Sequence, residues 1–100
     1  MDTRGIEYTF SAEIWYSGWY FVALPQDFAS EIRGNFQSLE EGWGRLKVTA
    51  KIGNSEWKTA IWFDTKRQTY LLPIKKEVRT REKIGIGAAV PITLWVQLQI

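Results

Sequence analysis

The sequence predicts a mostly β protein: a small closed barrel of six strands with two short helices, in one domain spanning residues 1–100. Three segments, residues 6–16, 45–52 and 90–100, alternate apolar and polar residues with the period of two that buries one face of a strand. With 100 residues the chain has room for a single hydrophobic core. Closing the strands into a barrel would bury their apolar faces and leave no exposed edge. An open sheet with both helices on one face is the alternative.

The N-terminal part predicts a hairpin. Residues 6–16 form its first strand, with Tyr8 and Phe10 on the apolar face. Ser17-Gly18 is a turn signal, and the apolar run 19–24 is typical of a return strand that is covered on both faces.

A short helix and a loop are expected next. Asp27 favours a helix start after Pro25, and Gly34 is typical of a helix end, so this helix is expected to end at Arg33. Residues 35–42 are polar without a clear period and predict a surface loop.

The C-terminal part predicts a second hairpin, a helix and a last strand. Residues 45–52 and 56–64 are joined by the tight turn Gly53-Asn54. A short strand over residues 70–72 leads to a helix over residues 73–84, which begins at a proline and ends at glycines. The last strand spans residues 90–100, and Pro91 is tolerated in it only near the start.

The composition excludes several function classes. The sequence contains no cysteine and no histidine, so serine–histidine and cysteine–histidine nucleophile systems are excluded, as are disulfides and sulfur-rich zinc sites. We expect no metal and no cofactor. The chain shows no secretory signal and no apolar run of the length that crosses a bilayer. These features predict a cytoplasmic protein with no membrane association.

Charge is distributed unevenly along the chain. Residues 1–43 contain two basic and seven acidic residues, whereas residues 44–100 contain eleven basic and four acidic ones. The basic segment 66–83 is the first candidate binding site, because Lys75, Arg79 and Lys83 recur at a spacing of four on the expected helix, with Lys76 beside them. Such a stripe could neutralise phosphates. The alternative is a solvated helix face on which Glu77 and Arg81 form a surface pair.

Tryptophans supply the second candidate. Six are present, and Trp15, Trp62 and Trp95 lie on the face opposite the main apolar row of their strands. If they cluster, they form an exposed aromatic platform for a base, a ring or a partner chain. The alternative is that they pack under loops and helices or seal a dimer.

Four blocks of the sequence resemble a known family. In chain order, these blocks are residues 19–25 (WYFVALP), Ile32-Arg33, residues 42–48 (GWGRLKV) and residues 70–79 (YLLPIKKEVR). These blocks are similar to the bacterial and archaeal domain of unknown function nineteen-hundred-and-five. The resemblance implies a double-split β-barrel, an architecture shared with transition-state regulators and antitoxins that bind DNA, and it implies no established activity. The family usually has an aspartate where Ala88 follows Gly87 here, so no role of that acid carries over.

Carboxylates offer the remaining catalytic route, because paired acids can hydrolyse glycosidic bonds without histidine. Glu7 and Glu13 stand roughly 20 Å apart on one strand, too far for paired work, and Glu40-Glu41 is expected to face water in a loop. A catalytic site would need a pocket that holds two carboxyls, or a carboxyl and an arginine, within hydrogen-bond reach.

We therefore expect a binding or interaction module rather than an enzyme. Its candidate binding residues are Arg33, Lys75, Lys76, Arg79, Lys83, Trp62 and Trp95. Its partner is unknown, and self-association as a homodimer stays open. A nucleic-acid-binding protein that uses the basic C-terminal half is the first alternative, and a small enzyme based on carboxylates is the second.

Overall fold

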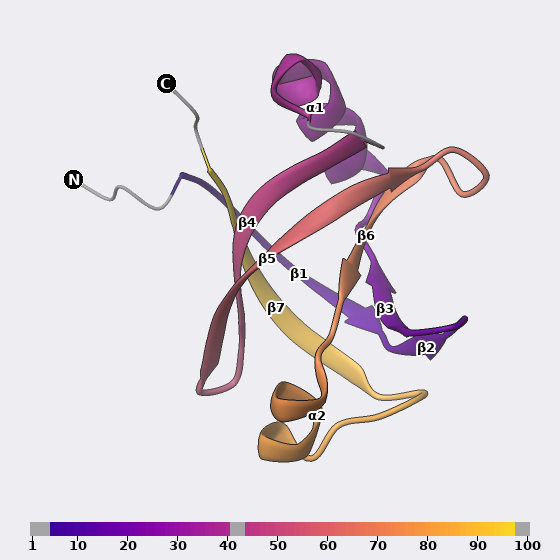
Figure 1. The fold of residues 1–100 in the computed structure, drawn as a ribbon, viewed down its shortest axis with the longest axis vertical. Helices are drawn as coiled ribbons and strands as arrows, with labels where there is room; N and C mark the ends of the chain where they lie inside the picture. Colours follow the sequence, from indigo (N-terminus) through magenta and orange to yellow (C-terminus); the bar gives the residue numbers. More distant parts are fainter. Residues whose placement is uncertain (1–4, 41–43, 98–100) are drawn as a thin grey trace.

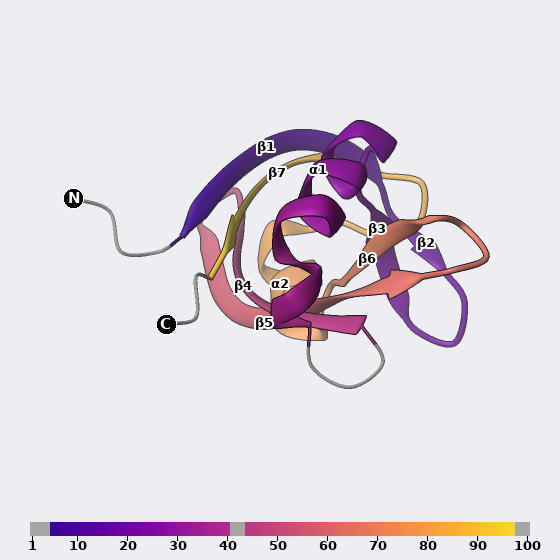
Figure 2. The same cartoon turned by 90° about the horizontal axis from the view of Figure 1, so that it is seen from above.

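The strands that the structure describes form one antiparallel sheet, which curls into a half-barrel. The computed structural model describes residues 5–40 and 44–97. Its strands are β1 (Ile6–Glu13), β2 (Trp15–Tyr16), β3 (Tyr20–Ala23), β4 (Arg45–Ile52), β5 (Ser55–Asp64), β6 (Thr69–Pro73) and β7 (Ala89–Val96). They lie in the order β1-β7-β4-β5-β6-β3-β2, and the curl is clearest from above (Figures 1 and 2).

Two α-helices cover the two ends of this half-barrel. Helix α1 (Gln26–Phe36) lies at one end and continues into a 3-10 turn, η1 (Gln37–Leu39), while α2 (Lys76–Glu82) lies at the opposite end (Figure 1). Within residues 5–40 and 44–97, no helix is long and apolar enough to span a bilayer.

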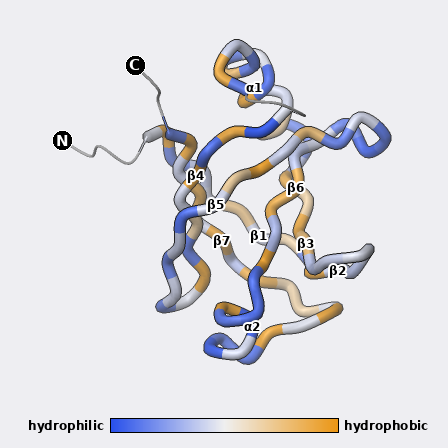
Figure 3. The backbone as a smooth tube through the Cα atoms, viewed as in Figure 1, coloured by the Kyte–Doolittle hydropathy of each residue, from blue (hydrophilic) through white to orange (hydrophobic). Residues whose placement is uncertain are grey.

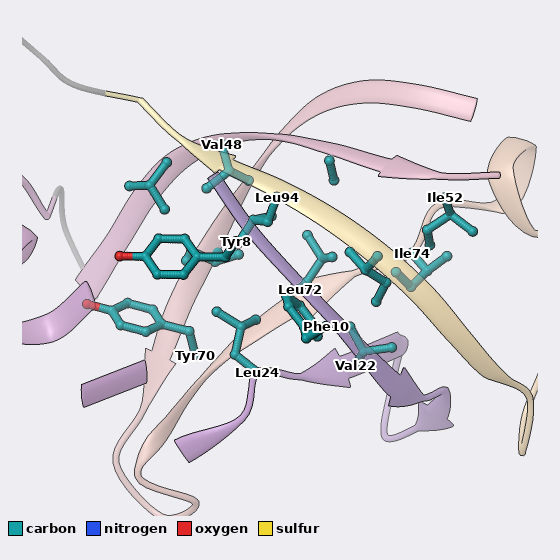
Figure 4. Close-up of a cluster of buried hydrophobic side chains, with 14 of the residues drawn as sticks. Tyr8, Phe10, Val22, Leu24, Val48, Ile52, Tyr70, Leu72, Ile74 and Leu94 are labelled. Atoms are coloured by element: carbon teal, nitrogen blue, oxygen red, sulfur yellow. The ribbon is translucent and has the colours of Figure 1, made fainter. Parts of the chain in front are cut away.

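The core fills the inside of the curl. Hydropathy alternates along β4 (Figure 3), whose Leu46, Val48, Ala50 and Ile52 are all buried. The inner faces of the other strands add residues such as Phe10, Leu72 and Leu94 (Figure 4). Each helix contributes an apolar side chain to the same cluster, Ile32 from α1 and Val78 from α2. The helices are therefore held by the hydrophobic stabilisation of the core that they cover.

The prediction of a closed six-stranded barrel is wrong in strand number and in closure, although the mostly β class with two helices is confirmed. The predicted first strand divides at Ile14, whose N–H and C=O are bound by Ala88 and Gly87 at 2.9 and 2.8 Å. Before this residue the chain pairs with β7, and after it with β3. The two edges of the sheet, β1 and β2, are thus joined through one residue. Segments joined so closely cannot lie antiparallel beside each other, and the sheet stays open.

Both helices differ in length from the prediction. Helix α1 continues through Gly34 to Phe36 because Phe36, one turn after Ile32, is also buried in the core. Residues 35–39 are therefore helical rather than a loop. Helix α2 begins at Lys76 instead of Pro73, because Pro73 is the last residue of β6 and is paired with Phe21.

The two predicted hairpin turns are confirmed, although only Trp15 and Tyr16 of the first predicted strand pair with β3. β2 pairs with β3 across the Ser17-Gly18 turn, and β4 pairs with β5 across Gly53-Asn54. Pro91 lies near the start of β7, where the chain pairs with β1 but not yet with β4. The predicted end of the last strand, residues 98–100, lies outside the described residues.

Candidate functional site

A groove runs between helix α1 and the turn that joins β5 to β6. Its wider part has a volume of about 520 Å³ and its narrower part about 320 Å³. The wider part is lined by Gln26, Ser30, Arg33, Gly34, Phe63, Thr65 and Gln68. Arg33, Phe63 and Thr65 also line the narrower part, which ends at Glu40 and Gly44. Arg33 therefore stands where the two parts of the groove meet.

Arg33 is held in place from two sides. Its Nη1 donates to both carboxylate oxygens of Glu40 at 3.3 Å, and its guanidinium lies 3.9 Å from the centre of the Phe63 ring. These contacts orient a planar cation. The side chain nevertheless keeps 32% of its surface exposed, so a ligand in the groove can reach it.

Glu40 is a nearly buried carboxylate, in contrast to the prediction that it faces water. Only 9% of its side chain is exposed. The Tyr70 hydroxyl donates a hydrogen bond to its Oε2. Burial raises the pKa of Tyr70 above the usual tyrosine range, and the hydrogen bond and the charge of Glu40 add to this effect. The structure thus brings a carboxyl and an arginine together in a groove within hydrogen-bond reach, which is the arrangement that a catalytic site without histidine would need.

Gly34 leaves the wider part of the groove open. It lies inside α1, and a Cβ atom added to it would meet no atom within 4 Å. Neither packing nor a left-handed backbone calls for glycine here, because Gly34 is absent from the positive-φ glycines. A glycine inside a helix costs about 0.5–1 kcal/mol relative to alanine. The visible consequence of this residue is space for an occupant of the groove.

A second buried tyrosine lies at the same end of the core. The hydroxyls of Tyr8 and Tyr70 point to the same side of the apolar cluster (Figure 4). Burial raises the pKa of Tyr8 to about 12, with help from the carboxylate of Glu31 on α1. Polar groups on α1 therefore meet tyrosine hydroxyls on both sides of the buried Ile32.

The basic candidates from the sequence do not join Arg33. Lys75, Lys76, Arg79 and Lys83 lie on or beside α2, at the opposite end of the half-barrel (Figure 1). Arg79 donates from Nε to the Ile74 carbonyl at 3.1 Å, and its guanidinium lies 3.6 Å from the Tyr20 ring centre. Lys75 pairs with Glu77 at 3.6 Å. The structure therefore does not show the predicted uniform stripe, nor the predicted pair between Glu77 and Arg81.

The off-pattern tryptophans divide into two places. Trp15 and Trp62 meet through Phe21, with ring centres 5.3 and 5.1 Å from that ring. Trp95 is separate: it is only 6% exposed and donates from Nε1 to Glu7 at 3.1 Å. A single platform made of all three is therefore not formed. Trp43 lies outside the described residues.

Comparison with known proteins identifies the family of the chain and leaves its activity open. A family model described as Domain of unknown function (DUF1905) matches residues 10–94. The chain belongs to this family. A search of curated proteins finds no match. The matched region of this DUF1905 domain contains every residue that lines the groove.

Sequence reasoning found only Arg33 among the main groove residues of this DUF1905 domain. Glu40 was not predicted as a site residue, because two adjacent acids in the sequence usually indicate a solvated loop. Tyr70 lies in a block that resembles the family, but a tyrosine in an expected strand usually indicates a core residue and not a site residue. Within the described residues, no three acidic side chains gather as metal ligands.

Proposed function

We propose that this DUF1905 domain is a non-catalytic binding module whose site is the groove at Arg33, and that its ligand is a small molecule with a carboxylate or phosphate group. The observation that carries this proposal is the position of Arg33. Among the residues that the structure describes, it is the one charged residue that lines the wider part of the groove. An oxyanion is the natural partner of an exposed guanidinium.

The surroundings of Arg33 suit such a ligand. Ser30 and Gln26 on α1 face Thr65 and Gln68 in the β5–β6 turn across the groove. Hydroxyl and amide groups of this kind can donate hydrogen bonds to an oxyanion. The volume of about 520 Å³ falls in the range of small-molecule sites. Phe63 adds apolar surface against which the rest of the ligand can pack.

Glu40 supports binding rather than catalysis in this proposal. A general base needs a lone pair directed at the substrate, whereas three of the roughly four lone-pair positions of Glu40 already accept hydrogen bonds, two from Arg33 and one from Tyr70. A tyrosine hydroxyl is protonated at neutral pH, and the raised pKa of Tyr70 extends its role as a donor to higher pH. The role of Glu40 is then to orient Arg33.

An NMR titration with benzoate tests the proposal, with benzamide as the neutral isostere. Benzoate is expected to shift the amide resonances of Ser30, Gly34 and Thr65 saturably, and benzamide is not. Arg33→Gln should weaken binding at least about tenfold, because a charge-assisted contact is lost. Arg45→Gln is the matched control, since Arg45 is an exposed arginine on β4 that does not line the groove.

A second variant keeps the test informative if Arg33→Gln unfolds. Gly34→Gln preserves the contact between Arg33 and Glu40 and fills the open space beside the helix. It is expected to abolish the benzoate shifts in a folded protein. Equal shifts with benzoate and benzamide, or unchanged binding in a folded Gly34→Gln variant, would refute the proposal.

A further inference from the structure

Three large apolar side chains are exposed in two neighbouring segments, the region of the β2–β3 turn and the loop before β7. Tyr16 is 55% exposed, Trp19 47% and Ile86 67%. The first two lie in and beside the β2–β3 turn. Ile86 belongs to the loop that is bound to Ile14, the residue just before β2, through Gly87 and Ala88. A small protein rarely leaves several large apolar side chains exposed in one area unless they contact something.

Helix α2 adds positive charge next to these residues. The guanidinium of Arg79 lies 3.6 Å from the ring centre of Tyr20, and Tyr20 contacts Tyr16 with ring centres 5.0 Å apart. Lys76 lies three residues before Arg79, on the same side of the helix. Lys83 follows at the end of α2. Arg79, Tyr20 and Tyr16 therefore form one continuous surface of a cation and two aromatic rings, with Lys76 and Lys83 on or beside the same helix.

The acidic residues of α2 are directed elsewhere. Glu77 pairs with Lys75, and both line a small cavity toward Trp57 on the other side of the helix. Glu82 accepts a hydrogen bond from the Ser55 hydroxyl at 2.6 Å. The side of α2 that faces Tyr20 thus presents cations without a carboxylate from the helix itself.

We propose that this surface, made of Tyr16, Trp19, Lys76, Arg79 and Lys83, binds single-stranded nucleic acid. Exposed aromatic rings can stack on unpaired bases, and the neighbouring cations can neutralise phosphates along the strand. Duplex DNA or RNA would engage the cations, but its bases are stacked inside the helix and would leave Trp19 unused. This site is independent of the groove at Arg33, because none of its five residues lines the groove and its cations lie on or beside α2, at the end of the half-barrel opposite α1 (Figure 1).

Fluorescence anisotropy with a labelled oligo-dT of about ten nucleotides tests this proposal. The wild-type protein is expected to bind it at low salt, with a log–log salt slope of about −2 if three phosphates are neutralised. Trp19→Ala should weaken binding about tenfold or more, and Trp19→Phe should retain most of the affinity. Lys76→Gln should lower both the affinity and the salt slope.

Matched controls separate this surface from general charge attraction and from the groove. Lys58→Gln removes an exposed lysine from β5 on another face and should leave binding unchanged. Gly34→Gln, which blocks the groove, should also leave it unchanged. Binding of a duplex of equal length as tightly as oligo-dT would overturn the proposal. So would equal losses from Lys58→Gln and Lys76→Gln, or competition by an acidic peptide as effective as unlabelled oligo-dT, which would point to a protein partner.

Discussion

Replacing Gly34 by alanine should make the protein more stable and its groove smaller. The added Cβ meets no atom within 4 Å and the residue lies inside α1, so the helical conformation suits alanine without strain. Alanine gains about 0.5–1 kcal/mol over glycine from helix propensity and from the lower entropy of the unfolded chain. For a domain of this size that gain raises Tm by about 3–6 °C. The same methyl group should weaken benzoate binding.

Thermal and urea unfolding, followed by tryptophan fluorescence and far-UV circular dichroism, measures this gain. Gly44→Ala is the matched control, because Gly44 lines the narrower part of the same groove but has φ +72°. Alanine in a left-handed conformation costs about 1–2 kcal/mol, so this variant should be destabilised. A Gly34→Ala protein that is no more stable than wild type would show that glycine is needed for packing or backbone geometry. Gly34 would then serve the helix itself and not the open space of the groove.

Three further predictions concern polar groups at the ends of the core. Ser55→Ala removes the hydroxyl that donates to Glu82 at 2.6 Å and should lower the free energy of unfolding by about 2 kcal/mol in urea titrations; an unchanged midpoint would contradict this. The folded-state pKa of Tyr8 is raised to about 12. The stability that the protonated Tyr8 hydroxyl contributes should therefore be complete below about pH 10 and be lost between about pH 10 and 12. In profiles of Tm against pH, the Tyr8→Phe variant should not show this loss. Tyr70→Phe takes a donor from the nearly buried Glu40 and should destabilise the fold by about 1–3 kcal/mol, measured by thermal unfolding.

The sequence could predict the regular strands because every second residue along them is apolar and enters the core. Strand β4 has the predicted bounds, Arg45–Ile52, since every second residue enters the core and the polar residues between them, apart from the buried Thr49, stay exposed. The tight turn Gly53-Asn54 then determines the register of β5. Where alternation and turn chemistry agree, local pattern is sufficient to place an element.

Tertiary contacts determine the features that the local sequence pattern could not predict, namely the break after β1, the end of α1 and the position of Glu40. Ile14 continues the alternation of β1, so nothing local marks the point where the backbone leaves one partner for another. Gly34 usually indicates a helix end, but the burial of Phe36 extends α1 beyond it. Glu40 became a site residue through Arg33 and Tyr70, which are seven and thirty residues away in the chain. A single sequence without homologues gives no signal for such a pairing.

The open sheet explains why both proposed sites lie where a helix meets the sheet. Because β1 and β2 are joined through Ile14, they do not pair with each other and the half-barrel stays open; a helix covers each of its two ends (Figure 1). Each helix buries one apolar side, through Ile32 in α1 and Val78 in α2, and leaves polar side chains along the boundary with the strands. At one boundary Arg33 meets Phe63, and at the other Arg79 meets Tyr20. An arginine on an aromatic ring thus recurs at both ends, because a helix that covers an open end places its long polar side chains over strand aromatics while its apolar side fills the core.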